Sequence, residues 1–528
     1  MPSLPYVPRP VPSRLSSPGS ASPRPRRRRL GRSARLALVL VASGALVLDV
    51  AALRPLPVAG DTGDIGTIDG SFAGTTDPTG SKRNESILWF NDGSWWASMW
   101  NPTLDEFHIF RLDVPTQRWI DTGTKLDTRA DTHADALWDG TKLYVATHRY
   151  AEDETNATSG YPSYLYRFSY STATGTYTLD PGFPAQINNL RTETLVIDKD
   201  STGTLWATWS KDSKIWVAHT LNGNDATWGT GYVLPLTDAQ NLTIDDNSAV
   251  IAFGGNQVGV MWSNQSTGHD AMYFASHRDG DPDGTWSSER TAIQGPGSAD
   301  DHMNLKVVAT DSGGKVYAAI KTSFNDVGNG SQPLIMLAVR DPATANWTDY
   351  PISRVSECPN RVLVLIDEEN RLIHAFYTAP GPPTYSCNSS GGEIETKVSS
   401  LDNIAFPVGV GTPVIRDNDS PYVHDVTSTK QNVSSATGIA ILARNSQTKL
   451  YWHAYFPIAP GGGTPPPTPS PTASPSASPS PSPSATATPT ATPTPTVTPT
   501  PSASASTSPS ATPTGTAPPS ATPTPTPS

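Results

Sequence analysis

Residues 298–326 read SADDHMNLKVVATDSGGKVYAAIKTSFND. The segment begins with ionisable side chains, enters a short apolar run, turns at the Gly pair 313–314, and returns through a second apolar run that ends at Lys321. Two apolar runs of this length joined by a glycine turn predict a β-hairpin. The polar residues at its two ends should therefore lie on one side of the molecule.

This pattern recurs along the chain. Each repeat has a polar start, an apolar strand, a turn, and a second strand with a small residue near its centre. The second strands are predicted at 94–100, 142–148, 204–210, 257–263, 315–321, 371–377 and 438–444. A third strand follows in each repeat, and a Trp is predicted to open the fourth strand at Trp119, Trp228, Trp286 and Trp347. Four-stranded repeats of roughly 50–65 residues indicate an all-β, seven-bladed β-propeller. A six-bladed ring and a β-sandwich are the alternatives.

The last repeat lacks a fourth strand after Phe456, and we expect residues 62–76 to supply it and close the ring. Residues 1–61 hold a basic stretch and then an apolar one, which is typical of an export signal, with an uncleaved membrane anchor as the alternative. Residues 459–528 are almost entirely Pro, Thr, Ser and Ala, a composition typical of a disordered low-complexity tail. The sequence thus predicts a propeller domain over 62–458, secreted or displayed at the cell surface, and a monomer.

Charge is divided unevenly along the chain. Ten of the 37 Lys and Arg and one of the 48 acidic residues lie in the first 60 residues, which leaves 27 basic against 47 acidic side chains, or −20, for the remainder. This acidity argues against nucleic acid and against an anionic membrane surface as partners. It favours a neutral or weakly charged glycan over a heavily sulfated one.

The two cysteines, Cys358 and Cys387, belong to one repeat. Cys358 falls at the start of the inner strand and Cys387 in the loop between the second and third strands, and a propeller brings these two places to the same face. In an exported chain this position predicts a disulfide, with two free thiols as the alternative.

The same face should collect the polar residues that begin the inner strands, together with the loops between second and third strands. The strand starts carry Lys82, Arg83, Asn84, Glu85, Arg129, Asp131, His133, Asp135, Arg191, Glu193, Asp245, Asp246, Asp300, Asp301, His302, Asn304, Lys306, Asn360, Arg361, His424, Asp425 and Lys430, and the loops add His148, Arg149, Tyr150, Trp209, Lys321 and Tyr377. Carboxylates, imidazoles and guanidiniums in one funnel suit acid–base chemistry on a sugar, or sugar binding. Any one of them serves equally well as a hydrated tunnel residue.

Metal motifs are weak. Residues 279–284 match the D-x-D-x-D-G start of a calcium loop, but Glu289 comes one residue too early to close it. We favour an acidic turn, with calcium as the alternative, and expect no other metal and no organic cofactor. The Cys and His residues lack zinc-site spacing, and there is no G-x-S-x-G, P-loop or dinucleotide motif.

The repeats resemble the BNR/Asp-box class of secreted propellers, which includes sialidases and BNR-repeat polysaccharide lyases of the ulvan-lyase type. The likeness rests on degraded Asp-box turns at 281–286 (DPDGTW), 91–96 (NDGSWW) and 341–347 (DPATANW). The sialidase F/Y-R-I-P pattern is missing, and Arg83, Arg191 and Arg361 are the best candidates for carboxylate-binding arginines. A lyase resemblance implies a His or Tyr base with an Arg or Lys beside the uronate carboxylate, whereas hydrolysis requires a pair of carboxyl groups.

We therefore expect an enzyme that cleaves an extracellular polysaccharide or glycoconjugate, as a glycoside hydrolase or polysaccharide lyase. A non-catalytic glycan-binding or adhesive propeller, or a cell-envelope scaffold, is the rival. The predicted catalytic residues are His133, Asp135, Glu193, Asp301, His302 and Tyr150. The predicted substrate-binding residues are Arg83, Arg191, Asn304, Lys321, Arg361, Trp209 and Tyr377.

Overall fold

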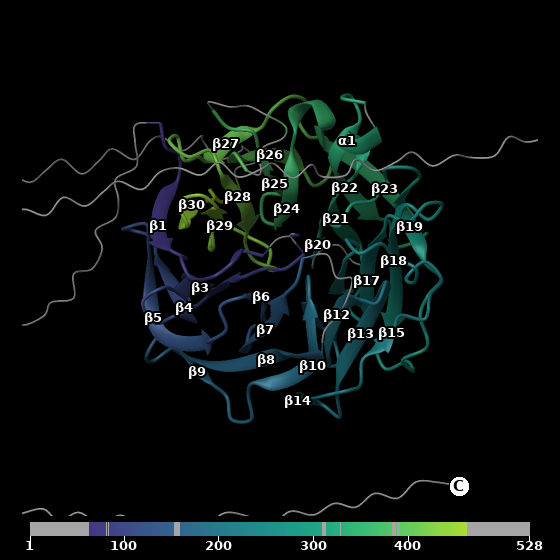
Figure 1. The fold of residues 1–528 in the computed structure, drawn as a ribbon, viewed down its shortest axis with the longest axis horizontal. Helices are drawn as coiled ribbons and strands as arrows, with labels where there is room; N and C mark the ends of the chain where they lie inside the picture. Colours follow the sequence, from purple (N-terminus) through teal and green to yellow (C-terminus); the bar gives the residue numbers. More distant parts are fainter. Residues whose placement is uncertain are drawn as a thin grey trace, which may run out of the picture.

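The computed structural model describes residues 63–461 except 81, 83, 153–158, 309–312, 328, 383–386 and 388–390. Over this range the chain forms seven β-sheets, arranged in a ring in chain order as Figure 1 shows. The predicted seven-bladed propeller is confirmed. The export segment, the low-complexity tail beyond residue 461 and Arg83 lie outside the described residues. Within them, no helix is long and apolar enough to cross a membrane.

The first sheet contains β2 (Leu88–Asn91), β3 (Ser94–Asn101), β4 (Glu106–Asp113) and β5 (Arg118–Asp127). The second contains β6 (Thr132–Trp138), β7 (Lys142–Tyr150), β8 (Ser159–Ser171), β9 (Thr176–Leu179) and β10 (Ala185–Thr192). The third contains β11 (Val196–Lys199), β12 (Leu205–Lys211), β13 (Lys214–Leu221), β14 (Asn224–Trp228) and β15 (Tyr232–Val233). The fourth and fifth contain β16 (Ser248–Phe253), β17 (Gln257–Asn264), β18 (Ala271–Arg278) and β19 (Arg290–Gln294); and β20 (Met303–Val307), β21 (Val316–Lys321), β22 (Pro333–Arg340) and β23 (Trp347–Arg354). The last two contain β24 (Asn360–Asp367), β25 (Leu372–Ala379), β26 (Glu393–Ser400) and β27 (Thr412–Ile415); and β28 (Val423–Thr427), β29 (Ile439–Asn445), β30 (Leu450–Phe456) and β1 (Thr67–Ser71). A short helix, α1 (Phe324–Val327), and a 3₁₀ turn, Val355–Glu357, lie in loops.

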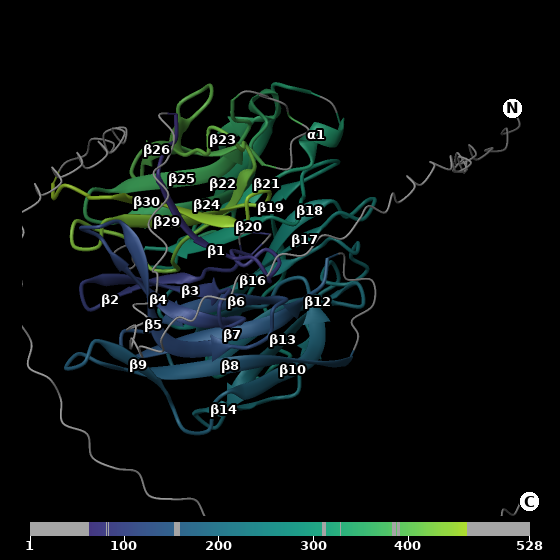
Figure 2. The ribbon, with the colours of Figure 1, turned by 60° about the vertical axis from the view of Figure 1, so that its left-hand side comes forward.

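The ring closes between strands from opposite ends of the described chain. β1 pairs antiparallel with β30, with Thr67 opposite His453. Figures 1 and 2 both show purple β1 beside the sheet of β29 and β30. Phe72, just after β1, is fully buried, and its ring centroid lies 5.2 Å from that of Tyr451. Residues 62–76 thus supply the missing fourth strand, as predicted.

Every predicted second strand occupies the second position of a sheet. These strands are buried on both faces because each sheet packs against a neighbour on either side, which explains their aromatic and small residues. The tryptophan prediction was only partly correct. Trp347 begins β23 and Trp119 is the second residue of β5, whereas Trp228 ends β14. Trp286 stays in the turn before β19, where it packs against His277 at 5.2 Å between ring centroids.

Side chains on the innermost strands join neighbouring sheets around the axis. The Asp135 carboxylate accepts the N–H of Ser86 at 2.9 Å and the N–H of Ile197 at 2.7 Å, so it links three consecutive sheets. Asp198 accepts the N–H of Ala252 at 2.7 Å and extends the chain of links to the fourth. Because buried backbone N–H groups need acceptors, these carboxylates fix the spacing of the blades. The inner strands are thereby held with their starts at one mouth of the tunnel.

Candidate functional site

Four blades meet at Lys82, at the mouth where the inner strands begin. Its Nζ lies 3.0 Å from Glu193 Oε1 and 3.1 Å from Asp245 Oδ1, and it also forms an ion pair with Asp301. Lys82, Glu193, Asp245 and Asp301 precede β2, β11, β16 and β20, respectively. One oxygen from each of the three carboxyl groups lies within 4.8 Å of the others. We call these four residues the Lys82 cluster.

Burial separates the proton affinities within this cluster. Burial raises the pKa of Glu193 to about 8, against the opposing attraction of Lys82. Burial likewise raises the pKa of Asp245 to about 6, and its side chain is 42% exposed, the most accessible of the three. Burial also works against ionisation of Asp301, but the His302 imidazole and the Lys82 ammonium hold its pKa well below the usual range. Near neutral pH the cluster therefore holds a protonated carboxyl beside an ionised one.

His302 lies next to the cluster and is oriented by two carboxylates. Its Nδ1 is 2.5 Å from Asp300 Oδ1 and 2.5 Å from Asp301 Oδ1. Lys321 forms an ion pair with the other oxygen of Asp300. Nε2 of His302 is buried without a hydrogen-bond partner in the described part of the chain. An imidazole held through one nitrogen by carboxylates is positioned to exchange a proton through the other.

Arg361 is neutralised within a second charged group at the mouth. Its Nε lies 2.7 Å from Asp425 Oδ1, and Arg444 Nε lies 2.7 Å from Asp425 Oδ2. Asp425 is fully buried, and His424 Nδ1 also lies 2.8 Å from it. Arg361 retains a side chain that is 25% exposed, so it can still meet a ligand.

Glu85, His133 and His148 form a third polar group, which Tyr150 borders. His148 Nε2 lies 2.6 Å from Glu85 Oε1, and His133 Nδ1 lies 3.8 Å from Glu85 Oε2. The Tyr150 ring stacks on His133 with 4.2 Å between centroids, and burial raises the pKa of the Tyr150 phenol. Arg191 donates to the backbone carbonyl of Tyr150 at 2.6 Å, which fixes the end of β7.

Other predicted site residues lie away from the mouth surface. Asp135 is the fully buried link between blades, where burial raises its pKa to about 6 and Lys430 lies 2.9 Å from it. Asn304 Oδ1 accepts the N–H of Val364 at 3.2 Å. Trp209 and Tyr377 are 2% and 1% exposed and pack in the core, so neither presents an open ring to a sugar.

The predicted disulfide between Cys358 and Cys387 is present, with 5.1 Å between Cα atoms. The acidic turn at 279–284 lies at the opposite side of its blade, between β18 and β19. Asp279 accepts from the Ser201 backbone at 3.2 Å, and Asp283 lies 3.1 Å from His219. Within the described residues, none of the groups of three or more clustered Asp, Glu or His ligands falls at this turn.

Lys82 and Asp245 were predicted only as two of many strand starts, without a role in the site. Their position at the start of an inner strand was the available signal, but which starts face each other across the axis depends on the ring. Arg444 was missed entirely, because it lies in the apolar second strand at 438–444. Arg444 is 4% exposed, and its Nη2 also lies 2.7 Å from Asp77 Oδ1.

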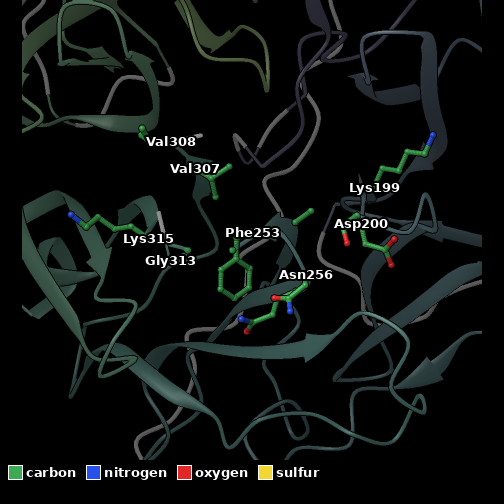
Figure 3. Close-up of a pocket in the computed structure, with 14 residues that line it drawn as sticks. Lys199, Asp200, Phe253, Asn256, Val307, Val308, Gly313 and Lys315 are labelled. Atoms are coloured by element: carbon green, nitrogen blue, oxygen red, sulfur yellow. The ribbon is translucent and has the colours of Figure 1, made fainter. Parts of the chain in front are cut away.

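A separate cavity of about 500 Å³ opens at the other ends of the inner strands, between the third, fourth and fifth blades. Figure 3 shows Phe253 and Asn256 between Lys199 on one side and Lys315 on the other. None of the predicted site residues that the structure describes lines it. Lys199 is engaged by Asp139 at 2.7 Å. Among the described residues that line it, Asp200 alone carries a carboxyl group, so this lining does not match the paired carboxyl groups of the Lys82 cluster.

Comparisons with known proteins add little. No protein-family model matches the chain, and no curated protein matches it. Among solved structures, the α-L-arabinanase of Penicillium chrysogenum complexed with arabinobiose is 13% identical, with a TM-score of 0.40 over 66% of this chain and 100% of that one. The periplasmic gluconolactonase of Pseudomonas aeruginosa is 11% identical, with a TM-score of 0.42 over 72% and 94%. The fucose-recognising, six-bladed Aleuria aurantia lectin is 15% identical, with a TM-score of 0.31 over 50% and 76%. At such identities and scores the likeness carries no argument about activity.

Proposed function

We propose that this propeller cleaves glycosidic bonds of an extracellular polysaccharide at the mouth formed by the Lys82 cluster. The observation that carries the proposal is the convergence of Glu193, Asp245 and Asp301 from three blades, with pKa values driven apart. Glycosidic cleavage by hydrolysis needs one carboxyl group that donates a proton and another that is ionised. Asp245, which is the most accessible of the three and has a pKa raised to about 6, is the proposed proton donor.

The short spacing of these carboxyl groups favours one stereochemical outcome. Their nearest oxygens lie within 4.8 Å, whereas an inverting hydrolase separates its carboxyl groups by roughly 6.5–9.5 Å to admit a water. We therefore expect retention of configuration at the cleaved carbon. Lys82 lies between the carboxyl groups and keeps Asp301 ionised, while Asp245 donates its proton and takes one up again in each turnover.

A second candidate, β-elimination from a uronic-acid glycan, is favoured by His302. Its Nδ1 is held by Asp300 and Asp301, and its Nε2 is free of any described partner, so it suits proton abstraction. Arg361 at the mouth would neutralise the uronate carboxylate. In this reaction the base removes the proton next to the carboxylate, and the glycosidic oxygen leaves with the bonding pair.

One assay separates these functions. The purified protein is incubated with neutral and uronic-acid polysaccharides while reducing ends and the absorbance of unsaturated uronates are followed. Reducing ends alone, abolished by Asp245→Asn, support hydrolysis; both signals, abolished by His302→Gln, support elimination. Asp402→Asn, an exposed carboxylate in the turn after β26, is the control and should keep full activity. Silence on every polysaccharide, with retention on a glycan array, would replace both candidates by a binding role.

We also infer that the protein works outside the cytoplasm, secreted or at the cell surface, as a monomer. The basic and apolar N-terminal stretches and the Cys358–Cys387 disulfide support this location. The degraded Asp-box turns support a relationship to BNR-type propellers on sequence alone. Fractionation of the producing cells, N-terminal sequencing and light scattering test the location, the processing and the oligomeric state; a full-length cytoplasmic protein would refute the location.

A further inference from the structure

We propose that Glu85, His133 and His148 bind one divalent transition-metal ion of the zinc class, buried beneath Tyr150. Glu85 precedes β2 in the first blade, while His133 and His148 face each other across the β6–β7 pair of the second. One ligand atom from each residue lies within 4.8 Å of the others. In a tetrahedral zinc site, with bonds of about 2.0–2.1 Å, ligand atoms are roughly 3.3 Å apart. Small side-chain shifts would bring this group to that spacing.

The first supporting observation is that this group contains buried polar atoms without a hydrogen-bond partner in the described part of the chain. His133 is 0% exposed, and neither of its ring nitrogens has a hydrogen-bond partner in the described part of the chain. Oε2 of Glu85, which is 4% exposed, is also without one there. Buried polar atoms normally find partners, because leaving one unpaired costs about 1–3 kcal/mol. A bound cation would satisfy both residues at once.

The second observation is that the surrounding backbone already orients the ligands. His148 Nδ1 lies 3.1 Å from both the carbonyl oxygen and the hydroxyl of Thr192. The carbonyl oxygen can only accept, so this contact favours the tautomer with the hydrogen on Nδ1, in which Nε2 presents its lone pair. That lone pair faces the Glu85 carboxylate at 2.6 Å. The N–H of Leu195 donates to the same carboxylate at 3.0 Å and fixes its position. Metal-binding histidines characteristically donate the N–H of the other ring nitrogen to a carbonyl oxygen in this way.

A lone pair that faces a carboxylate needs either a proton or a metal between them. Two imidazoles with one carboxylate are the ligand set of borderline ions such as Zn²⁺, whereas Ca²⁺ and Mg²⁺ prefer oxygen alone. The two other clusters of Asp, Glu and His in the described residues each have a lysine ammonium in contact, Lys82 or Lys321, that meets their negative charge. Among the described residues, the Glu85 carboxylate forms ion pairs only with its own two imidazoles. This difference singles it out as the metal site.

The test is metal content and metal affinity of the full chain, produced without a histidine tag. After dialysis against a chelator, Zn²⁺ is titrated and bound metal is measured by mass spectrometry; we expect one equivalent per chain and a higher melting temperature. His133→Gln and Glu85→Gln should each abolish stoichiometric binding, checked for folding by circular dichroism. His374→Gln is the matched control, since His374 is 2% exposed with an unpartnered Nε2 outside any such cluster.

Co²⁺ substitution gives a readout that a purely structural role would not move. A four-coordinate site with two imidazoles produces visible d–d absorption, which should appear with the wild type and His374→Gln and disappear with Glu85→Gln. A folded wild type that takes up no stoichiometric Zn²⁺ or Co²⁺ overturns the proposal and leaves a proton shared between Glu85 and His148. Binding retained by both Glu85→Gln and His133→Gln overturns it equally.

Discussion

Replacing Lys82 by methionine tests how the mouth is held together. The substitution keeps the length of the side chain but removes the Lys82 ammonium from among three carboxyl groups, of which those of Glu193 and Asp301 are buried. Removing one partner of a buried ion pair costs about 3–5 kcal/mol, because the remaining charge stays buried without compensation. We therefore expect Lys82→Met to lower the free energy of unfolding by about 4 kcal/mol at pH 9.

This loss should depend on pH in a defined direction. The folded-state pKa of Glu193 is raised to about 8, above its ordinary 4.5, so in the wild type the stability linked to Glu193 falls as the pH rises through that window. Without Lys82 the pKa of Glu193 rises further, so the fall extends to higher pH and becomes larger. At pH 5, Glu193 and Asp245 both hold protons and need no counter-charge, so the loss in Lys82→Met should shrink to about 1–2 kcal/mol.

Urea unfolding at both pH values measures these losses. Lys211→Met is the control, because Lys211 Nζ lies 2.8 Å from Asp212, which is 56% exposed, and such surface pairs contribute about 0–1 kcal/mol. Adding Glu193→Gln to Lys82→Met should restore part of the stability at pH 9. Equal losses at pH 9 and pH 5, or a loss no larger than that of the control, would refute the assignment of Lys82 as the counter-ion of buried carboxylates.

Three further variants test other parts of the structure by urea unfolding. Burial lowers the folded-state pKa of His374 to about 4, so stability should fall by about 3 kcal/mol as the pH drops from 6.5 to 4, and His374→Phe should remove this fall; an unchanged slope contradicts it. Replacing Cys358 and Cys387 by serine opens a loop with a sequence separation of 29 and should cost about 3–4 kcal/mol. Phe72→Ala should cost about 3–5 kcal/mol, since Phe72 secures the closing strand; a loss below about 1 kcal/mol would mean that β1 does not hold the ring.

The fold could be predicted from the sequence because short local patterns determine its strands and turns, and because these patterns repeat along the chain. Each second strand carries its own apolar pattern and turn, so a short segment such as 298–326 already specifies a hairpin, and the repetition of this pattern specifies the ring. The strand within 62–76 could be predicted because the last repeat lacked a fourth strand, and this segment was available to supply it. The prediction that Trp286 opens a strand was wrong. Trp286 packs in the turn against His277, and such a contact depends on spatial neighbours that a local sequence pattern does not reveal.

The site was less accessible to the same reasoning. The sequence correctly gathered the strand starts on one face, and it also placed the two cysteines together. It did not indicate which charges meet, because Lys82 and Asp301 are brought together only by the diameter of the ring. Trp209 and Tyr377 were expected to face ligand, but the period-two alternation of a strand leaves open which loop-end residues turn into the core.

The pairing of β1 with β30 has a consequence for synthesis. Thr67 and His453 face each other across the closing pair, although nearly the whole domain lies between them in sequence. The strand that leaves the ribosome first must therefore wait, unpaired, for the strand that leaves last. During that interval β1 has open edges that can pair with other chains. A chaperone that shields the residues around β1 until translation passes Phe456 would raise the yield of closed rings more than one acting on any later blade.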